Sequence, residues 1–382
     1  MNRELFESIP DRRNTHSLKW GKYDGSDIIP LWVADMDFKS PPEVVSAAVK
    51  AAEFGNFGYC HTPLTLVDIL LQRFKDLYHW QIQKNWIIWL PSVACGLNVC
   101  CRALKMDSSQ VFTQIPIYPP FLSAPGNFGL SSKEIPMKLE NHRFSFDFDA
   151  LGKLDTSPGD LFMLCHPHNP VGTAYTEAEL HRFSEWIVSR KLYLCSDEIH
   201  CDLILDSESK HFPIASISPE LAKRCITLMA PSKTFNLPGF GCSFAIISEP
   251  QLRVKFKLAC QGIVPEPPGM GFALAEAAYR HGEPWRQELL KYLTQNRDDA
   301  CNELSRMPFL VPYSPQATYL LWIDARELPV DNPHKYFEEY GVGLSDGKDF
   351  AAPGFLRLNL GCSNQLLHEA LQRMNKACEA LS

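Results

Sequence analysis

Several features that would assign a protein to a simple class are missing from this sequence. Its 13 cysteines are an odd number and include no CxxC pair. No apolar run has the length needed to span a bilayer, and the opening segment MNRELFESIPDRRN lacks the apolar core of a signal peptide. Lys and Arg are scattered and the net charge is −7, so we expect neither a nucleic-acid nor a membrane partner.

The cysteines that are present lie largely in apolar runs, such as Cys100 and Cys101 in LNVCCRAL and Cys195 in LYLCSDE. Buried free thiols behave as small apolar side chains. Their odd number favours a reducing compartment, and we expect the protein to be cytoplasmic.

The chain has 382 residues, which favours two domains or one large layered domain with an appendage. A proline-rich stretch at 264–269 precedes a helical pattern from about Phe272 to Leu304. We predict an N-terminal segment, 1–45, that packs with the small domain. A large domain over 46–284 and a small C-terminal domain over 285–382 complete the prediction.

Helical patterns alternate with short apolar runs along the middle of the chain. Ser40-Pro41-Pro42-Glu43 is typical of a capping box and predicts a helix through about Phe54, with Val45 and Val49 on its apolar stripe. Thr176 and Glu179 predict another capped helix. The apolar runs are VFTQIPI, LFMLC, LYLC, ITLM and SFAII. Runs without polar alternation suit strands covered on both faces, so we predict a mostly parallel α/β sheet.

Distinctive polar residues follow four of these runs. They are Tyr118, Asn169, Asp197 and Lys233. Because ligands of parallel α/β sheets bind beyond the carboxyl ends of the strands, we expect these four side chains to share one crevice.

Together these side chains suit the chemistry of pyridoxal 5′-phosphate (PLP). A lysine binds the cofactor covalently and later moves protons, and a carboxylate keeps the pyridine nitrogen protonated. An aromatic ring can stack on the pyridine, and an amide can bond the ring oxygen. The phosphate needs N–H groups at a helix start, which Ser92-Val93-Ala94 can supply, with a hydroxyl from Ser232.

A metal site is the alternative for the histidines near these residues. His166, His168 and His200 lie close in sequence to Asp197 and Glu198. Their spacing matches no standard zinc motif, so we predict packing or hydrogen-bonding roles and no metal.

The motifs resemble a known family when read in order. Tyr118, Asn169-Pro170-x-Gly172, Asp197-Glu198 and Ser232-Lys233, followed by Arg357 in FLRLNLG, resemble the fold-type I PLP-dependent aminotransferases of classes I and II. LWVADMDF, FGY, HPHNPVGT, SDEIH and APSKTFNLPG are similar to the cystathionine β-lyase branch, which includes C–S lyases and a modulator of maltose genes. The likeness covers nearly the whole chain. It implies a large domain with a mostly parallel sheet between helices and a smaller α+β C-terminal domain.

The resemblance also implies roles for individual residues at the cofactor. Lys233 would bind PLP, Asp197 would pair with the pyridine nitrogen, Asn169 would contact the ring oxygen, and Tyr118 would stack on the ring. His200 stands where many aminotransferases have a tyrosine, and we expect it to contact the cofactor.

Further implied roles concern the substrate and the neighbouring subunit. Arg357 would hold the substrate carboxylate, for which its planar fork is suited, with Asn169 and Ala34 beside the substrate. Tyr59 would reach the phosphate of a neighbouring subunit in a homodimer. No arginine follows the lysine motif at 237–242, where many relatives place a phosphate-binding one.

The reaction that we expect is α,β-elimination from cystathionine or another S-substituted L-cysteine, which gives a thiol, pyruvate and ammonia. An aminotransferase is the alternative, because both reactions begin with removal of the Cα proton. The lyase-like N-terminal segment favours elimination. A regulatory binding protein that retains a PLP site is a further alternative, by analogy with the maltose-gene modulator.

Overall fold

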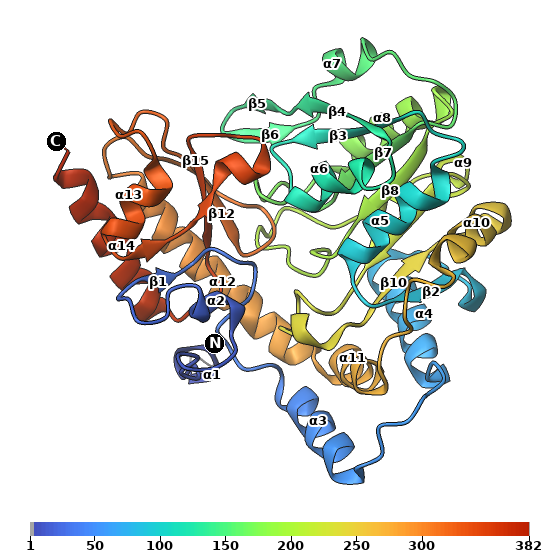
Figure 1. Ribbon diagram of the computed structural model, residues 1–382, viewed down its shortest axis with the longest axis horizontal. Coiled ribbons are helices and arrows are strands. Elements are labelled where there is room, and N and C mark those ends of the chain that lie inside the picture. Colours follow the sequence, from blue (N-terminus) through green and yellow to red (C-terminus); the bar gives the residue numbers. More distant parts are fainter. Residues whose placement is uncertain (1–3, 382) are drawn as a thin grey trace.

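The computed structural model describes residues 4–381, and its centre is a large sheet (Figure 1). In the described chain this sheet has seven strands in the order β2-β10-β9-β8-β7-β3-β4. Their bounds are β2 (Ile87–Leu90), β10 (Ser243–Ile246), β9 (Cys225–Met229), β8 (Tyr193–Asp197), β7 (Leu161–Cys165), β3 (Gln110–Ile115) and β4 (Ser131–Pro136). The pairs from β9 to β4 are parallel, whereas β10 is antiparallel to both neighbours. The predicted mostly parallel sheet is confirmed.

Helices cover both faces of this sheet. Leu161, Met163 and Cys165 of β7 contribute to one apolar core, and Phe162 and Leu164 contribute to the other. This alternation is the period of two expected for a strand that is buried on both faces. One core includes α5 (Val93–Leu104), α6 (Pro119–Gly126) and α10 (Pro250–Cys260). The other includes α4 (Leu64–Tyr78), α8 (Glu177–Ser189), α9 (Pro219–Ala222) and α11 (Gly269–His281).

A second, antiparallel sheet lies in the C-terminal part, with strand order β11-β12-β15-β14. Its strands are β11 (Val311–Tyr313), β12 (Leu320–Asp324), β15 (Phe355–Asn359) and β14 (Ser345–Asp346). Its companion helices are α12 (Glu283–Leu304), α13 (Pro333–Glu339) and α14 (Asn364–Glu379). The predicted smaller α+β part is therefore present.

The N-terminal residues pack with this C-terminal part. β1 (Ile29–Pro30) pairs in parallel with β13 (Val342–Gly343). Figure 1 shows α1 (Glu4–Glu7) and α2 (Leu18–Gly21), in blue, beside the orange and red C-terminal elements. The limits of the three proposed segments, 1–45, 46–284 and 285–382, remain our proposal.

Further helices and strands lie outside these groups. They are α3 (Pro42–Phe54), α7 (Phe148–Gly152), β5 (Lys138–Glu140) and β6 (Arg143–Ser145). No helix among residues 4–381 is both long enough and apolar enough to cross a membrane.

Two local expectations were wrong. Ser40 does not cap α3: Pro41 occupies the N-cap, and the Ser40 hydroxyl donates to the carbonyl of Asn236 at 3.0 Å. The helical pattern over 272–304 is two helices, because Gly282 separates α11 from α12. The capping box of Thr176 and Glu179 is confirmed at the start of α8.

Candidate active site

All predicted site residues except Tyr59 line one cavity of about 200 Å³ at the carboxyl ends of the parallel strands. They are Ala34, Ser92, Val93, Ala94, Tyr118, Asn169, Asp197, His200, Ser232, Lys233 and Arg357. The sheet supplies most of them from loops after β2, β3, β7, β8 and β9, whereas Arg357 comes from β15 of the second sheet. The four residues that follow the strands, Tyr118, Asn169, Asp197 and Lys233, therefore share one crevice, as predicted.

Lys233 presents an amine that can lose its proton near neutral pH. Its Nζ donates a hydrogen bond to the carbonyl of Ala34 at 2.6 Å. Burial and the nearby charge of Arg357 lower the pKa of Lys233 to about 8, against the opposing charges of Asp35 and Asp197. An amine with this pKa can act both as a nucleophile and as a base.

Asp197 is a buried carboxylate without a cation of its own. It accepts one hydrogen bond, from the backbone N–H of Ile199 at 3.0 Å, and forms no ion pair with the described residues. Burial raises the pKa of Asp197 to about 7. Because burying an unpaired charge is costly, a cationic partner inside the cavity would stabilise the ionised form of Asp197.

The neighbouring Glu198 is bonded away from the cavity. Its carboxylate accepts from the Ser196 hydroxyl at 2.9 Å and from the N–H of Ile214 at 3.1 Å, and it pairs with His211 Nε2 at 2.7 Å. The His211 ring stacks on His166 with centroids 4.5 Å apart. Among the described residues, no group of three or more His, Cys, Asp or Glu side chains is arranged to hold a metal ion.

The buried guanidinium of Arg357 is positioned to bind an anion. Its NH1 donates to the side-chain oxygen of Asn169 at 2.9 Å, and NH2 donates to the carbonyl of Trp32 at 2.9 Å and to the Ser345 hydroxyl at 3.1 Å. The Nε atom is buried and has no partner among the described residues. Burial lowers the pKa of Arg357 to about 10, so a carboxylate beside this guanidinium would be strongly favoured.

The first turn of α5 forms an anion-binding corner of the cavity. Ser92 is its N-cap, and its hydroxyl accepts from the backbone N–H of Cys95 at 3.1 Å. The N–H groups of Val93 and Ala94 stand in the first turn, where no intrahelical partner exists. Such groups favour a phosphate. Cys242 also lines this cavity.

His200 contributes an uncharged ring to the cavity. Burial, together with the charges of Lys233 and Arg357, lowers the pKa of His200 to about 3. Its Nδ1 is buried without a partner among the described residues. The ring can therefore exchange a hydrogen bond with a bound group while remaining neutral.

Tyr59 lies outside this cavity. It is fully exposed and borders a separate hollow of about 980 Å³ together with Phe54 and Phe57. A single chain therefore does not bring Tyr59 to Lys233, and its predicted role depends on a second subunit.

Several residues at the cavity were not predicted. Val33, Cys165 and Cys242 line it, and Ser345 and Trp32 hold Arg357. The LWVADMDF segment was a usable signal for Trp32 and Val33. No sequence motif points to Ser345. Its contact with Arg357 arises from the pairing of β14 with β15.

Comparisons with known proteins agree with this geometry. The family model described as aminotransferase class I and II matches residues 26–374. Cystathionine beta-lyase PatB of Bacillus subtilis (strain 168) is 32% identical, over 97% of this chain and 99% of its own. The crystal structure of OvoB is 41% identical with a TM-score of 0.95 and 98% coverage of both chains. Cystalysin from Treponema denticola, whose structure contains PLP, is 30% identical with a TM-score of 0.92 and 99% coverage of both.

Proposed function

Because this chain belongs to the aminotransferase class I and II family, we propose that it is a PLP-dependent C–S β-lyase. Its reaction is α,β-elimination on cystathionine or another S-substituted L-cysteine, with release of a thiol, pyruvate and ammonia. The similarity to a cystathionine β-lyase over nearly the whole chain supports this choice.

The residues of the cavity fit PLP. Lys233 can bind the aldehyde, Asp197 can pair with the pyridine nitrogen, and Tyr118 can stack on the ring. The first turn of α5 and Ser232 suit the phosphate. PLP supplies, when bound, a ring that accepts the electrons left at the substrate Cα. The observation that carries the proposal is the buried Asp197 carboxylate, which lacks a cation and shares a cavity with the Lys233 amine.

Residues of the chain bind the substrate and remove its proton. Arg357 binds the α-carboxylate through its fork, and this contact fixes the orientation of the Cα–H bond. Lys233 takes the Cα proton, for which a pKa of about 8 is well matched near neutral pH. Asn169 accepts from Arg357, so one amide links the cofactor side of the cavity to the substrate side.

The experiment that tests this function distinguishes α,β-elimination from transfer of the amino group to a keto acid. The purified PLP-loaded protein is incubated with cystathionine or an S-alkyl cysteine without any keto acid, and pyruvate, ammonia and thiol are measured. Elimination predicts the three products in equal amounts. Turnover that requires a keto-acid acceptor would instead assign an aminotransferase. Lys233→Ala is the control that abolishes both routes.

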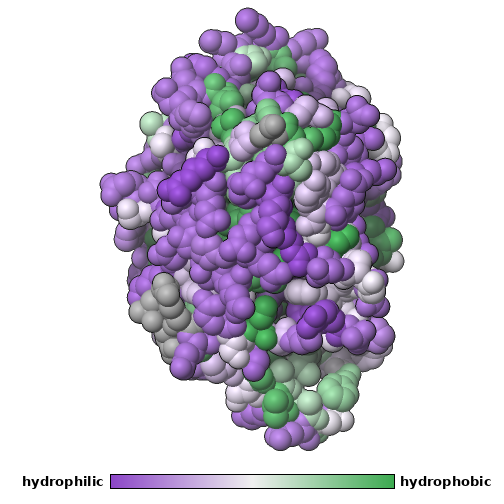
Figure 2. All heavy atoms as spheres, turned by 90° about the vertical axis from the view of Figure 1, so that its left-hand side faces the viewer, coloured by the Kyte–Doolittle hydropathy of each residue, from purple (hydrophilic) through white to green (hydrophobic). Residues whose placement is uncertain are grey.

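We also propose a homodimer in which Tyr59 reaches the partner's active site. Val49 of α3 is 50% exposed, and Phe54, Phe57 and Leu64 are between 70% and 79% exposed. In Figure 2, hydrophobic atoms gather at the lower end of the molecule, at the height of α3 in Figure 1. Exposed apolar surface of this kind suits a subunit interface.

Sedimentation velocity tests the dimer. Val49→Asp places a charge on this surface and should shift the protein toward monomers, whereas Val311→Asp, a change at an exposed valine of the second sheet, should not. A monomeric wild-type protein with full activity would exclude the role of Tyr59.

We assign the protein to the cytoplasm. All thirteen cysteines are free, and nine of them are buried in the described chain. Free thiols in such number suit a reducing compartment.

A further inference from the structure

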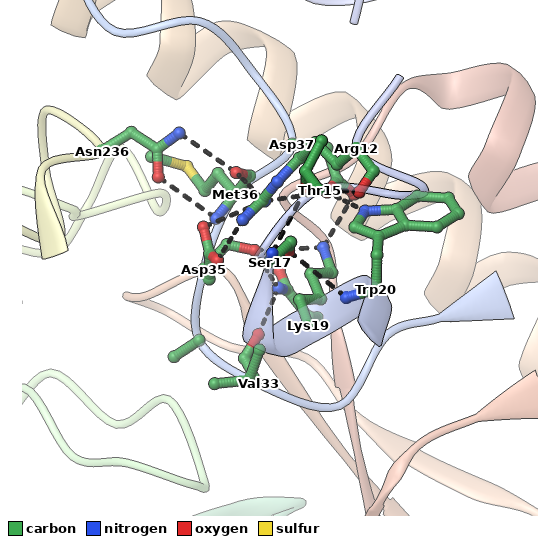
Figure 3. Close-up of polar contacts among 12 residues, drawn as sticks. Arg12, Thr15, Ser17, Lys19, Trp20, Val33, Asp35, Met36, Asp37 and Asn236 are labelled. Atoms are coloured by element: carbon green, nitrogen blue, oxygen red, sulfur yellow. Dashed lines mark hydrogen bonds and ion pairs between the residues drawn. The ribbon is translucent and has the colours of Figure 1, made fainter. Parts of the chain in front are cut away.

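Side chains from residues 12–20 contact the segment 32–37, as Figure 3 shows for Arg12, Lys19 and Trp20. Val33 and Ala34 of this segment line the active-site cavity. Arg12 forms a bidentate pair with Asp35, with NH2 at 2.6 Å from Oδ2 and NH1 at 3.2 Å from Oδ1. Lys19 Nζ lies 2.7 Å from Asp37, and both side chains are almost completely buried. Trp20 Nε1 donates to the same carboxylate at 2.9 Å. These contacts fix the position of the 32–37 segment.

The opposite side of this segment meets the reactive residues. The carbonyl of Ala34 accepts from Lys233 Nζ at 2.6 Å and from the Tyr319 hydroxyl at 3.2 Å. Asn236, three residues after Lys233, donates to the carbonyls of Met36 at 3.0 Å and Phe38 at 2.7 Å. The loop that carries Lys233 is therefore bonded to the 32–37 segment at two places, Lys233 to Ala34 and Asn236 to Met36.

Three charged groups influence the Lys233 amine: Asp35 from the 32–37 segment, Asp197 from β8 and Arg357 from β15. A fourth titratable group, His200 in the loop after β8, faces the same amine, whose charge lowers the pKa of that histidine. Asp35 contributes the largest of the charge effects on the pKa of Lys233, after burial itself. The Arg12 and Asp35 side chains are only 21% and 19% exposed, so solvent screens their charges weakly.

We propose that Arg12 is a positioning residue for Lys233. Through its bidentate pair with Asp35 it holds the Ala34 carbonyl against the lysine amine, and it offsets the negative charge that Asp35 places beside that amine. This inference rests on the proposed function, in which Lys233 carries the cofactor. Arg12 does not line the cavity, so its effect on Lys233 is indirect.

The proposal predicts shifts of opposite sign from the two partners. Arg12→Gln leaves Asp35 uncompensated, which favours the charged form of the Lys233 nitrogen and should raise its titration midpoint. Asp35→Asn removes the negative charge and leaves Arg12, so the midpoint should fall. Each shift should be roughly 0.5–1 pH unit, below the range for direct contact. Arg12 also contacts Asp37 at 3.2 Å, but Lys19 pairs with that carboxylate at 2.7 Å. The double variant should therefore shift less than either single variant, because it removes one positive and one negative charge.

The measurement is a pH titration of the visible absorbance of the PLP-loaded protein without substrate, which reports the charge on the Lys233 nitrogen. Arg12→Lys keeps the charge and should stay near the wild type. Arg13→Gln is the matched control, because Arg13 pairs with Asp11 at the surface and both are more than 60% exposed. If Arg12→Gln does not fold, as judged by circular dichroism, Asp35→Asn and Arg12→Lys carry the test.

Midpoints that move in the same direction in both single variants, or that do not move, overturn the inference. So does a shift of equal size in Arg13→Gln. A wild-type protein that develops no visible absorbance with PLP would instead refute the proposed function, so the two failures are distinguishable.

Discussion

Arg357 shows how one residue of the second sheet completes a site built by the first. It lies in β15, opposite Trp322 of β12 and Ser345 of β14, and its guanidinium reaches Asn169 in the loop after β7. The side chain is 5% exposed, so its charge is poorly solvated. A buried guanidinium held by neutral acceptors is preorganised for a carboxylate.

Replacing this guanidinium should weaken substrate binding more than cofactor binding. Arg357→Ala is expected to lower kcat/KM for an S-substituted cysteine by roughly 10²-fold, because hydrogen bonds to a charged group contribute about 1.5–3 kcal/mol. The visible absorbance with PLP should remain. Steady-state kinetics beside a cofactor titration measures both effects. An equal loss of PLP affinity would contradict the assigned role.

The sequence predicted those residues whose position follows from a strand end. Asp197 is the last residue of β8, and Lys233 and Asn169 each follow a buried strand by four residues. Arg12 and Ser345 could not be predicted in this way. Their contacts with Asp35 and Arg357 join segments whose relative position only the folded chain sets.

At the scale of elements, the loop after β7 depends on one glycine. Gly172 has a φ of 69°, and a Cβ there would lie 2.7 Å from Pro315 Cα and 3.1 Å from the carbonyl of Ala317. The N–H of Ala317 donates to the carbonyl of Gly172 at 2.9 Å. The loop that presents Asn169 therefore needs both the left-handed backbone and the missing side chain at this position.

Gly172→Ala should consequently destabilise the protein by roughly 1–3 kcal/mol, the usual scale for backbone strain with a close contact. Gly152→Ala is the matched control, because Gly152 ends α7 with no atom within 4 Å of the added Cβ. Thermal unfolding compares the two variants. Equal unfolding temperatures would show that the contact with Pro315 is unimportant.

Buried strands were more predictable than the exposed edge strand of the large sheet. Apolar runs identified β3, β7, β8, β9 and β10, yet not β4, whose sequence SSKEIP is mostly exposed at the sheet edge. Hydrophobic pattern does not reveal an edge strand of this kind, since pairing with β3 rather than burial defines it. Val45 and Val49 lie on the predicted apolar stripe of α3, yet both are exposed in the single chain.

For the whole molecule, acid should be destabilising. Burial lowers the pKa of four histidines from 6.5 to about 3; they are His166, His168, His200 and His211. A depressed histidine pKa stabilises the fold above about 6.5, and this stability is lost as the pH falls toward 3. Asp197 and Glu198, whose pKa values are raised to about 7, act in the opposite direction, since their contribution is lost as the pH rises through 7. The histidines outnumber these carboxylates, so the net loss on acidification should dominate.

His168 offers the cleanest test of this pH dependence. Neither of its ring nitrogens has a hydrogen-bond partner among the described residues, and it does not line the cavity. His168→Leu removes a group that must charge in the unfolded state, so the pH of half-unfolding should move lower. Tryptophan fluorescence during acid titration measures that midpoint. An unchanged midpoint would contradict the role given to this histidine.

The position of the covalent link to the cofactor is the central claim, and borohydride tests it most directly. The protein is saturated with PLP, reduced with borohydride, digested and mapped by mass spectrometry. The account predicts a stable phosphopyridoxyl adduct on Lys233 and its absence in Lys233→Ala. An adduct on a different lysine, or none at all in the wild-type protein, would contradict it.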